Sequence, residues 1–325
     1  MGIKQLKDID RNYISQNFEL AVLIGAVKVK VARNGKRFAD IVIQDASKMM
    51  EAKYWDYEDN EEFINSISVE DPVNIKAVVG EYQGQIQVTI KHIERADIDS
   101  IDIVDLIPTS TWGLENMKDG LDFFYEKVTS PHMKRLIDKM IFSNDHFKMF
   151  STHPAARRVH HNYYHGLLQH TLEVLKFSYI VAATKKLSER QIERLIVMAM
   201  LHDWAKIIEY KPLPNVGFTE EGVMLGHVFL GAHNTLNAIN EIEDFNQDDK
   251  LIIINGILSH HGYLEFGSPV LPKTVEAQIL HQADKMSGDI ESITTFISEQ
   301  ENEEEAFTSK LWNMGTNYYK KGIDD

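Results

Sequence analysis

Residue types that bind metal ions recur within the apolar helical patterns of the second half of this chain. They are His170, the adjacent pair His202 and Asp203, His227, the pair His260 and His261, and Asp284. Burying several such groups without partners would cost about 1 to 3 kcal/mol each, and more for a carboxylate. One hydrogen bond often satisfies a lone buried histidine, but a set of this size is best satisfied by shared cations. We therefore expect a metal site assembled from several helices.

The composition restricts the chemistry of that site. The 325 residues include no cysteine, so thiolate ligands are excluded and His, Asp and Glu must bind the metal. Such ligands suit manganese, iron, magnesium or zinc. Eleven of the fourteen histidines lie between His153 and His281, which places the chemistry in this part of the chain.

The two adjacent pairs indicate more than one ion. Neighbouring residues of a helix point about 100° apart, so His202 and Asp203 reach one site only if it lies against the side of their helix. There Asp203 could bridge two ions, while His260 and His261 could each face a different one. Two ions could use a bridging hydroxide as the nucleophile and neutralise a phosphate in the transition state.

The elements that position these residues are predicted to be helices. Residues 117–150 read as two amphipathic helices broken at Ser130-Pro131. Ser188 and Gln191 form a capping box at the start of a helix that runs to His202 and Asp203. The other expected helices span about 163–186, 222–242, 248–261 and 273–297. The tail from residue 299 is expected to be a solvated acidic helix.

The first half has a different periodicity. From about residue 18 to residue 96, apolar and polar residues alternate, which indicates half-buried strands. Hairpin turns are expected at Asn34-Gly35, where both residues would take positive φ values, and at Tyr82-Gln83-Gly84. About five strands, with a helix near residues 58–67, predict a small Greek-key barrel of the OB type.

Barrels of this type often bind single strands by stacking bases on aromatic rings and by contacting the backbone with cations. The side chains expected to do so here are Arg33, Lys36, Arg37, Phe38 and Trp55. Alternatively, the aromatic rings fill the barrel and the basic residues are ordinary solvated residues of a turn.

The order of the metal-binding residues resembles that of the HD phosphohydrolase superfamily. His170, then His202-Asp203, then Asp284 matches its H, HD, D series, and His227 with His260-His261 matches its binuclear branch. The chain further resembles the YhaM family of bacterial exoribonucleases over nearly its whole length. The matching segments are "NGKRFADIVIQD", "EAKYWD", "HPAARRVHHNYYHGLLQH", "LHDWAKIIE", "TEEGVMLGHV", "LSHHGYLEFGSP" and "EAQILHQADKM".

The resemblance implies a two-domain protein. An N-terminal all-β OB-like barrel (1–98) and a helical connector (99–150) precede a C-terminal all-α HD-domain helical bundle (151–298) and an acidic tail (299–325). The implied activity is metal-dependent removal of nucleotides from the 3′ end of single-stranded RNA, or of single-stranded DNA, with release of 5′-monophosphates. Two ions are implied, with Mn²⁺ expected and Fe²⁺, Co²⁺, Mg²⁺ or Zn²⁺ as alternatives.

The resemblance also implies roles for individual residues. The implied ligands are His170, His202, Asp203, His227, His260 and Asp284, with His261 either a ligand or a partner of one. Lys206 completes an HD-x-x-K motif and is expected to hold a substrate phosphate. Phosphate binding is expected for Arg157, Arg158 and His160, and proton transfer in catalysis or phosphate binding for His161. Alternatively, the two arginines belong to a charged loop that does not contact substrate. Trp204 departs from the small or aliphatic residue usual after the HD pair.

Net charge and hydropathy restrict the kinds of molecule that this protein can bind. The net charge of −15 means that a polyanionic substrate must be met by a local basic groove or by metal ions. No apolar run approaches the roughly 18 residues that span a bilayer, and the N-terminus lacks the features of a signal peptide, so we expect a cytoplasmic protein without membrane contact. Two alternative functions remain: a phosphohydrolase of small nucleotides, and a nucleic-acid-binding module with a degenerate HD site. A homo-oligomer is a further possibility.

Overall fold

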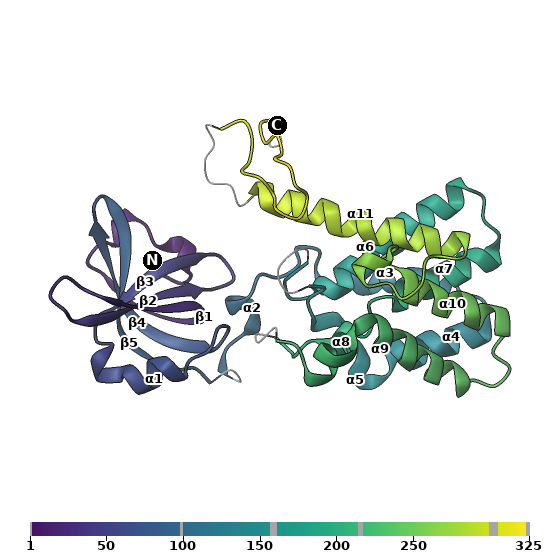
Figure 1. Cartoon of the computed structure of the whole chain (residues 1–325), viewed down its shortest axis with the longest axis horizontal. Helices are drawn as coiled ribbons and strands as arrows, with labels where there is room; N and C mark the ends of the chain where they lie inside the picture. Colours follow the sequence, from purple (N-terminus) through teal and green to yellow (C-terminus); the bar gives the residue numbers. More distant parts are fainter. Residues whose placement is uncertain (1, 98–99, 157–160, 214–216, 299–304, 323–325) are drawn as a thin grey trace. The chain divides into compact units, whose positions relative to one another are not determined.

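The computed structural model describes residues 2–97, 100–156, 161–213, 217–298 and 305–322 (Figure 1). Its contacts divide the chain into one unit of residues 1–109 with 212–216, and a second unit of residues 110–211 with 217–325. Each unit has its own hydrophobic core. The segment 99–150, predicted as a connector, is divided between the two units, because its helices after residue 113 pack into the core of the second.

The first unit contains a closed five-stranded barrel with the strand order β1-β2-β3-β5-β4, the order of an OB fold. The strands are β1 (Asn17–Val31), β2 (Arg37–Gln44), β3 (Met49–Tyr54), β4 (Pro72–Tyr82) and β5 (Gln85–Arg95). The short helix α1 (Glu61–Ser66) follows β3, as predicted. Alternate residues such as Val73, Ile75 and Ala77 point inward and are buried. The predicted OB-like barrel is therefore confirmed.

The hairpin predicted at Tyr82-Gln83-Gly84 is confirmed, whereas the turn between β1 and β2 differs in detail from the expectation. Gln83 and Gly84 both take positive φ, but at the β1–β2 turn only Gly35 does, at φ +82°. The amide of Gly35 donates to the carbonyl of Ala32, and the amide of Ala32 to that of Lys36. A longer turn with one left-handed residue therefore replaces the two-residue turn predicted at Asn34-Gly35.

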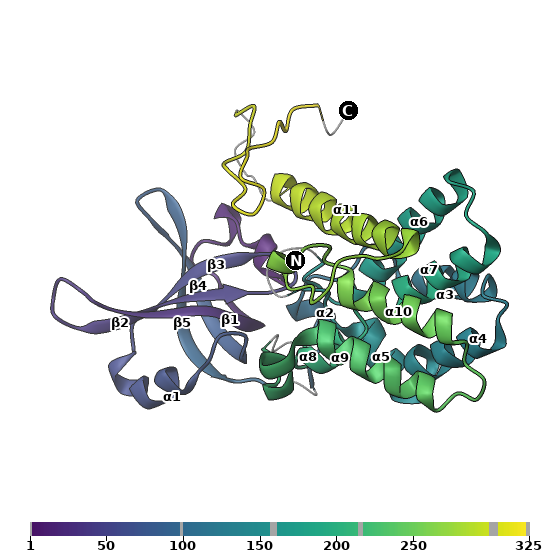
Figure 2. The ribbon, with the colours of Figure 1, turned by 45° about the vertical axis from the view of Figure 1, so that its right-hand side comes forward.

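The second unit is a helical bundle, as predicted (Figures 1 and 2). Its helices begin, after the short α2 (Ile103–Leu106) of the first unit, with α3 (Leu114–Glu126), α4 (Pro131–Ile137), the π-helical turn η5 (Asp138–Phe142) and α5 (Asn144–Thr152). They continue with α6 (Gly166–Thr184), α7 (Glu189–Leu201), α8 (Lys206–Glu209), α9 (Glu220–Asn240), α10 (Gln247–Ser259), the 3-10 turn η6 (Leu264–Phe266) and α11 (Val275–Ser298).

Two expectations about these helices are wrong. The second predicted helix before residue 150 is broken again, because Ser143 has an extended backbone between η5 and α5. In the expected helical tail, residues 305–322 instead form a hairpin, in which Phe307 pairs with Tyr319 and Leu311 with Thr316. Among the described residues, no helix is long and apolar enough to cross a membrane.

Candidate metal centre

The HD pair lies in a turn and not inside a helix. Helix α7 ends at Leu201, and His202 and Asp203 occupy the turn that leads into α8. The prediction of a helix running through both residues is therefore wrong. The backbone of His202 is still helical, at φ −55° and ψ −41°, and its Nε2 atom lies 3.4 Å from Oδ2 of Asp203.

The first cluster consists of His170, His202, Asp203 and Asp284, from α6, the HD turn and α11. Nε2 of His170 lies 3.1 Å from Oδ1 of Asp284, 3.3 Å from Oδ2 of Asp203 and 3.2 Å from Nε2 of His202. His170 and His202 are fully buried. Three elements far apart in the sequence thus bring two imidazoles and two carboxylates to one point.

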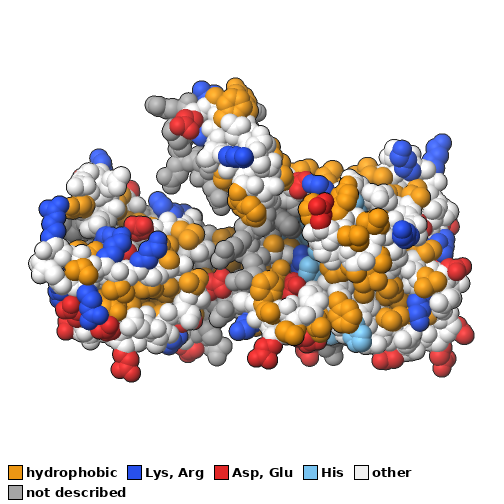
Figure 3. Space-filling view, in the orientation of Figure 1, with side chains coloured by type: hydrophobic (Ala, Val, Ile, Leu, Met, Phe, Trp, Pro, Cys, Tyr) orange, Lys and Arg blue, Asp and Glu red, His pale blue; other side chains and the backbone are white. Residues whose placement is uncertain are grey.

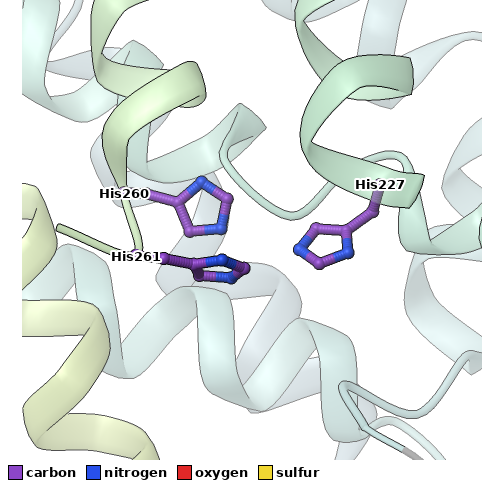
Figure 4. A group of neighbouring side chains, drawn as sticks. All are labelled: His227, His260 and His261. Carbon is purple, nitrogen blue, oxygen red and sulfur yellow. The ribbon is translucent and has the colours of Figure 1, made fainter. Parts of the chain in front are cut away.

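The second cluster consists of His227 from α9 with His260 and His261 from the end of α10 (Figure 4). Oδ1 of Asp203 lies 3.5 Å from Nε2 of His227 and 3.6 Å from Nε2 of His260. Since Oδ2 of the same carboxylate faces the first cluster, Asp203 stands between the two clusters with one oxygen toward each.

Two glycines shape the backbone that presents the second cluster. Gly226 has φ +70° and ψ 153°, a conformation open almost only to glycine, and it kinks α9 immediately before His227. Gly262 follows the histidine pair at φ +80°, and a Cβ there would lie 2.1 Å from the ring of His281. His281 in turn donates from Nδ1 to the carbonyl of His260, at 2.8 Å.

Each of the five histidines in these clusters has its Nδ1 atom engaged by an acceptor. Two acceptors are side chains: Oγ of Ser287 for His170 and Oε1 of Glu209 for His227. The other three are backbone carbonyls, that of Ala199 for His202, that of Ile257 for His260 and that of Phe266 for His261. A proton on Nδ1 leaves the lone pair on Nε2, the atom that faces each cluster. This arrangement is typical of histidines that bind metal ions.

The facing atoms need a cation. Oδ1 of Asp203 and the Nε2 atoms of His227 and His260 are buried and have no hydrogen-bond partner within the described part of the chain. Converging acceptors of this kind repel one another unless a positive charge lies among them. Imidazole and carboxylate donors suit divalent manganese, iron, cobalt or zinc. The residues present therefore fit a divalent metal centre.

Burial and neighbouring charges set the protonation of these groups. Burial holds the pKa of His260 well below its ordinary value, which favours the neutral ring that binds metal. Burial alone would lower the pKa of His170, but hydrogen bonds with Asp203 and Asp284 raise it to about 9. Burial raises the pKa of Asp203, but the positive charges of Lys206 and His202 outweigh it and bring this pKa well below its usual range.

A further layer of polar groups supports His170. Ser287, one turn after Asp284 on α11, accepts from His170 and donates to Oε2 of Glu173, at 2.7 Å. Glu173 also contacts Nε2 of His161, at 3.2 Å. Burial raises the pKa of Glu173, but its hydrogen bonds, that with His161 foremost, lower it to about 2. The carboxylate therefore stays ionised and anchors the chain of contacts that ends at His170.

The HD-domain cavity has a volume of about 420 Å³. It is lined by Asp203, Lys206, His261, Phe266, His281, Asp284, Lys285, Gly288, Asp289, Ser292, Asn313 and Met314. Nζ of Lys206 lies 2.5 Å from Oδ2 of Asp203, and this carboxylate raises the pKa of the lysine although burial opposes it. The cavity thus offers an ammonium group beside the metal-binding carboxylates.

Trp204 points away from this chemistry. Its indole Nε1 donates to the carbonyl of Met140 in η5, at 2.6 Å, and its ring meets the edge of His146. Trp204 is 3% exposed and belongs to the hydrophobic core of the second unit. It therefore anchors the HD turn to the preceding helices, which explains why a large residue stands between the HD pair and Lys206.

The other residues of this half that were predicted to bind phosphate or assist catalysis do not line the described part of the cavity. Arg157, Arg158 and His160 lie outside the described residues. His161 is buried, its ring centroid 5.3 Å from that of His170, and it is not among the residues that line the HD-domain cavity. Its contacts give it a supporting position behind His170 and not one at the cavity wall.

On the barrel, the predicted nucleic-acid contacts separate into two groups. The rings of Phe38 and Trp55 stack at 4.5 Å, with Trp55 40% exposed. The guanidinium of Arg37 makes two hydrogen bonds of 2.8 Å to the carboxylate of Glu61. Arg33 and Lys36 are exposed, and their side chains form no ion pair with any described residue. Trp55, Arg33 and Lys36 are thus available, whereas Arg37 is engaged within the barrel.

Sequence reasoning missed several supporting residues. Glu209 accepts hydrogen bonds from both the backbone amide and Nδ1 of His227. Ser287 and Glu173 each follow a cluster residue by three positions on the same helix face. Helical spacing from Asp284 and His170 was the signal that could have identified the last two.

Comparison with known families agrees with this geometry. Residues 167–289 match the family model described as HD domain, and residues 21–96 match the model described as OB-fold nucleic acid binding domain. The first range contains both clusters, and the second contains most of the five-stranded barrel.

Three solved structures have a weak likeness to part of the chain. The mitochondrial single-stranded DNA binding protein Rim1 from S. cerevisiae is 11% identical, over 26% of this chain and 95% of its own, with a TM-score of 0.23. The SSB domain of a Synechococcus sp. protein is 15% identical, over 24% and 93%, with a TM-score of 0.21. The second OB-fold domain of replication protein A from Methanococcus maripaludis is 13% identical, over 28% and 90%, with a TM-score of 0.20. The strand order of the barrel, the two family matches and the clusters lead to one conclusion. The chain joins an OB-fold nucleic acid binding domain to an HD domain of the metal-dependent phosphohydrolase type.

Proposed function

We propose that this protein is a metal-dependent 3′-to-5′ exoribonuclease that releases 5′-mononucleotides from single-stranded RNA, with single-stranded DNA as a second substrate. The observation that carries the proposal is the presence, in one chain, of an OB-fold nucleic acid binding domain and an HD-domain cavity beside a histidine-carboxylate cluster and a cluster of three histidines. The polarity comes from the resemblance to the YhaM family.

The size of the cavity is compatible with a nucleotide. A volume of about 420 Å³ lies within the range of sites for small molecules and is large enough for one nucleotide. On the barrel, Trp55 offers a face for base stacking, and Arg33 and Lys36 offer cations for the backbone.

The residues at the cavity would have two roles in phosphodiester hydrolysis, metal binding and phosphate binding. His170, His202, Asp203 and Asp284 would hold one ion, and His227, His260 and His261 would hold a second that shares Asp203. When bound, such ions, with Mn²⁺ expected, activate water as a nucleophile and neutralise charge on the phosphate. Lys206 places an ammonium group at the cavity wall, where it binds a phosphate oxygen and stabilises the charge that develops on it.

The test is incubation of the full-length protein with Mn²⁺ and a 5′-labelled single-stranded RNA. We expect a ladder that shortens from the 3′ end, with release of 5′-mononucleotides. Asp203→Ala removes the carboxylate shared by both clusters and should abolish the ladder. Asp119→Ala, at an exposed position on α3, is the matched control and should leave it unchanged.

Two results would contradict the proposal. Cleavage of a circular single-stranded RNA would indicate an endonuclease. Intact linear RNA together with hydrolysis of a free nucleotide would instead support the alternative, a phosphohydrolase of small nucleotides.

A further inference from the structure

The C-terminal hairpin, residues 307–319, is a part of the molecule whose sequence carries no sign of chemistry. Its two arms are joined through Phe307 and Tyr319, and through Leu311 and Thr316, and Gly315 completes the turn at φ +69°. The hairpin, in yellow, lies beside α11 in both ribbon views (Figures 1 and 2). Figure 3 shows the side chains on the face seen in Figure 1.

The turn of the C-terminal hairpin reaches the HD-domain cavity. Asn313 and Met314 line the cavity together with Lys285, Asp289 and Ser292 of α11. Met314 is half-buried, whereas Trp312 in the same turn is 79% exposed. The turn therefore directs Met314, and not the larger Trp312, toward the cavity.

The cavity wall combines two kinds of surface. Asp203, Lys206 and Asp284 provide charged groups beside the metal clusters, and the ion pair of Lys285 with Asp289 adds two more further along α11. Phe266, from η6, and Met314 are the apolar side chains among the lining residues, and Phe266 is 59% exposed. A nucleotide has the same division, because its phosphate is charged while its base is a flat ring with apolar faces. The amide of Asn313 can both donate to and accept from a base edge.

We propose that Phe266 and Met314 form a base subsite, which holds the terminal nucleobase of the strand while Lys206 holds its 5′ phosphate. The ligand class is therefore a nucleoside 5′-monophosphate unit, free or at the 3′ end of a strand. This subsite deepens the proposed exonuclease function and rests on it for the identity of the strand. It also gives the C-terminal hairpin a role in substrate binding.

Contacts of this kind tolerate any base. Every base has a π face that can stack on the ring of Phe266. Methionine is unbranched and polarizable, so Met314 adapts to rings of different size. We therefore expect little discrimination between purines and pyrimidines, as complete degradation of a strand requires.

The test measures binding and does not depend on catalysis. Isothermal titration calorimetry of the full-length protein, in the presence of Mn²⁺, compares uridine 5′-monophosphate with ribose 5-phosphate, which lacks the base. The wild type should bind uridine 5′-monophosphate more tightly. Phe266→Ala should weaken that binding about tenfold, the size of a lost stacking contact, and Met314→Ala about 2- to 10-fold, the size of a lost sulfur–aromatic contact. Both variants should leave binding of ribose 5-phosphate unchanged.

Two further variants make the result specific. Met314→Leu keeps an apolar side chain and should retain most of the affinity for uridine 5′-monophosphate. Met224→Ala removes an exposed methionine of α9 that does not line the cavity, and should have no effect.

Equal loss of affinity for both ligands in Phe266→Ala and Met314→Ala, or no loss for either, would overturn the base subsite. Failure of the exonuclease assay with base-dependent binding intact would overturn only the proposed function, so the two failures are distinguishable.

Discussion

At the scale of residues, the metal centre depends on side chains that do not face the metal. Each cluster histidine is oriented by an acceptor on Nδ1, and two of these acceptors, Ser287 and Glu209, are side chains. Glu173 holds Ser287 in turn. A histidine that loses its acceptor can rotate or protonate on the wrong nitrogen, so these partners decide how well the clusters bind an ion.

Ser287→Ala tests this support. The change removes the acceptor of His170 while leaving all seven cluster residues in place. We expect Mn²⁺ affinity, measured by isothermal titration calorimetry, to fall about 10- to 100-fold, as is usual when such a partner is lost. Ser298→Ala, at an exposed position near the end of the same helix, is the control and should bind as the wild type does. Equal affinities in the two variants would contradict a supporting role for Ser287.

At the scale of elements, the ends and breaks of helices present the ligands. The HD pair lies in the turn after α7, His260 and His261 follow the last turn of α10, and His227 follows the kink of α9. Two glycines leave the helical conformation beside these ligands: Gly226, before His227, at φ +70°, and Gly262, after the histidine pair, at φ +80°. Backbone conformation at a few positions therefore controls the geometry of the second cluster.

Gly226→Ala tests the kink. A Cβ at this position meets no other atom within 4 Å, so the substitution adds backbone strain without a clash. We expect a loss of about 1 to 3 kcal/mol in the free energy of unfolding, together with weaker Mn²⁺ binding as His227 shifts.

Gly35→Ala is the matched control for this change. Gly35 has φ +82°, and a Cβ there is equally unobstructed, but the residue lies in a turn of the barrel. This variant should lose stability without any change in Mn²⁺ affinity. Unchanged Mn²⁺ affinity in Gly226→Ala would show that the kink does not position His227.

The contact between α7 and the loop that joins α3 to α4 makes folding stability depend on pH in the acid range. Glu193 accepts hydrogen bonds from the amides and hydroxyls of Thr129 and Ser130. Burial raises the pKa of Glu193, but these bonds outweigh it and hold the pKa below the ordinary value of 4.5. The folded state therefore releases this proton more readily than the unfolded state. The resulting stability is present above pH 4.5 and is lost as the pH falls through the lowered pKa.

Glu193→Gln should follow that dependence. At pH 7 we expect the free energy of unfolding, from urea denaturation, to fall by about 1 to 3 kcal/mol, because the amide satisfies fewer of the four donors. The difference from the wild type should shrink as the pH falls from 4.5 through the lowered pKa, where the folded wild-type carboxylate also becomes protonated. Glu243→Gln changes an exposed glutamate and should have little effect at any pH. A difference that does not depend on pH would contradict this account.

At the scale of the whole molecule, the proposed strand-binding surface and the metal clusters belong to separate units. The barrel and the helical bundle have separate cores, so a surface change in one should not disturb the other. The exposed ring of Trp55 belongs to the first unit and both metal clusters to the second. Strand affinity and phosphodiester chemistry are therefore expected to respond to different substitutions.

Trp55→Ala tests this division. Loss of one stacked base is worth about 1 to 3 kcal/mol, so the Kd for single-stranded RNA should rise about 5- to 100-fold in fluorescence anisotropy. Hydrolysis of methyl p-nitrophenyl phosphate, which offers the barrel no strand to bind, should not change. Phe123→Ala, at an exposed aromatic residue of α3, is the control. Equal RNA affinity in both variants would remove Trp55 from the interface.

The sequence by itself determined the two architectures and the ligand types. Alternation of apolar residues predicted the strands of the barrel, and helical periodicity predicted α6, α7, α9, α10 and α11 to within a few residues. Both patterns are local, because burial of one face repeats with the period of the element itself. The order of His170, the HD pair and Asp284 is also a property of the sequence alone.

The tertiary structure decided what each residue contacts. It showed that Ser287 joins His170 to Glu173, that Trp204 anchors the HD turn to η5, and that Met314 reaches the cavity. It also showed that Glu61 engages Arg37, a residue expected to contact nucleic acid. These contacts join residues tens to more than a hundred positions apart, and no periodic pattern encodes them. A side chain's role in the site depends on which partners the fold brings to it, and only the packed structure supplies those partners.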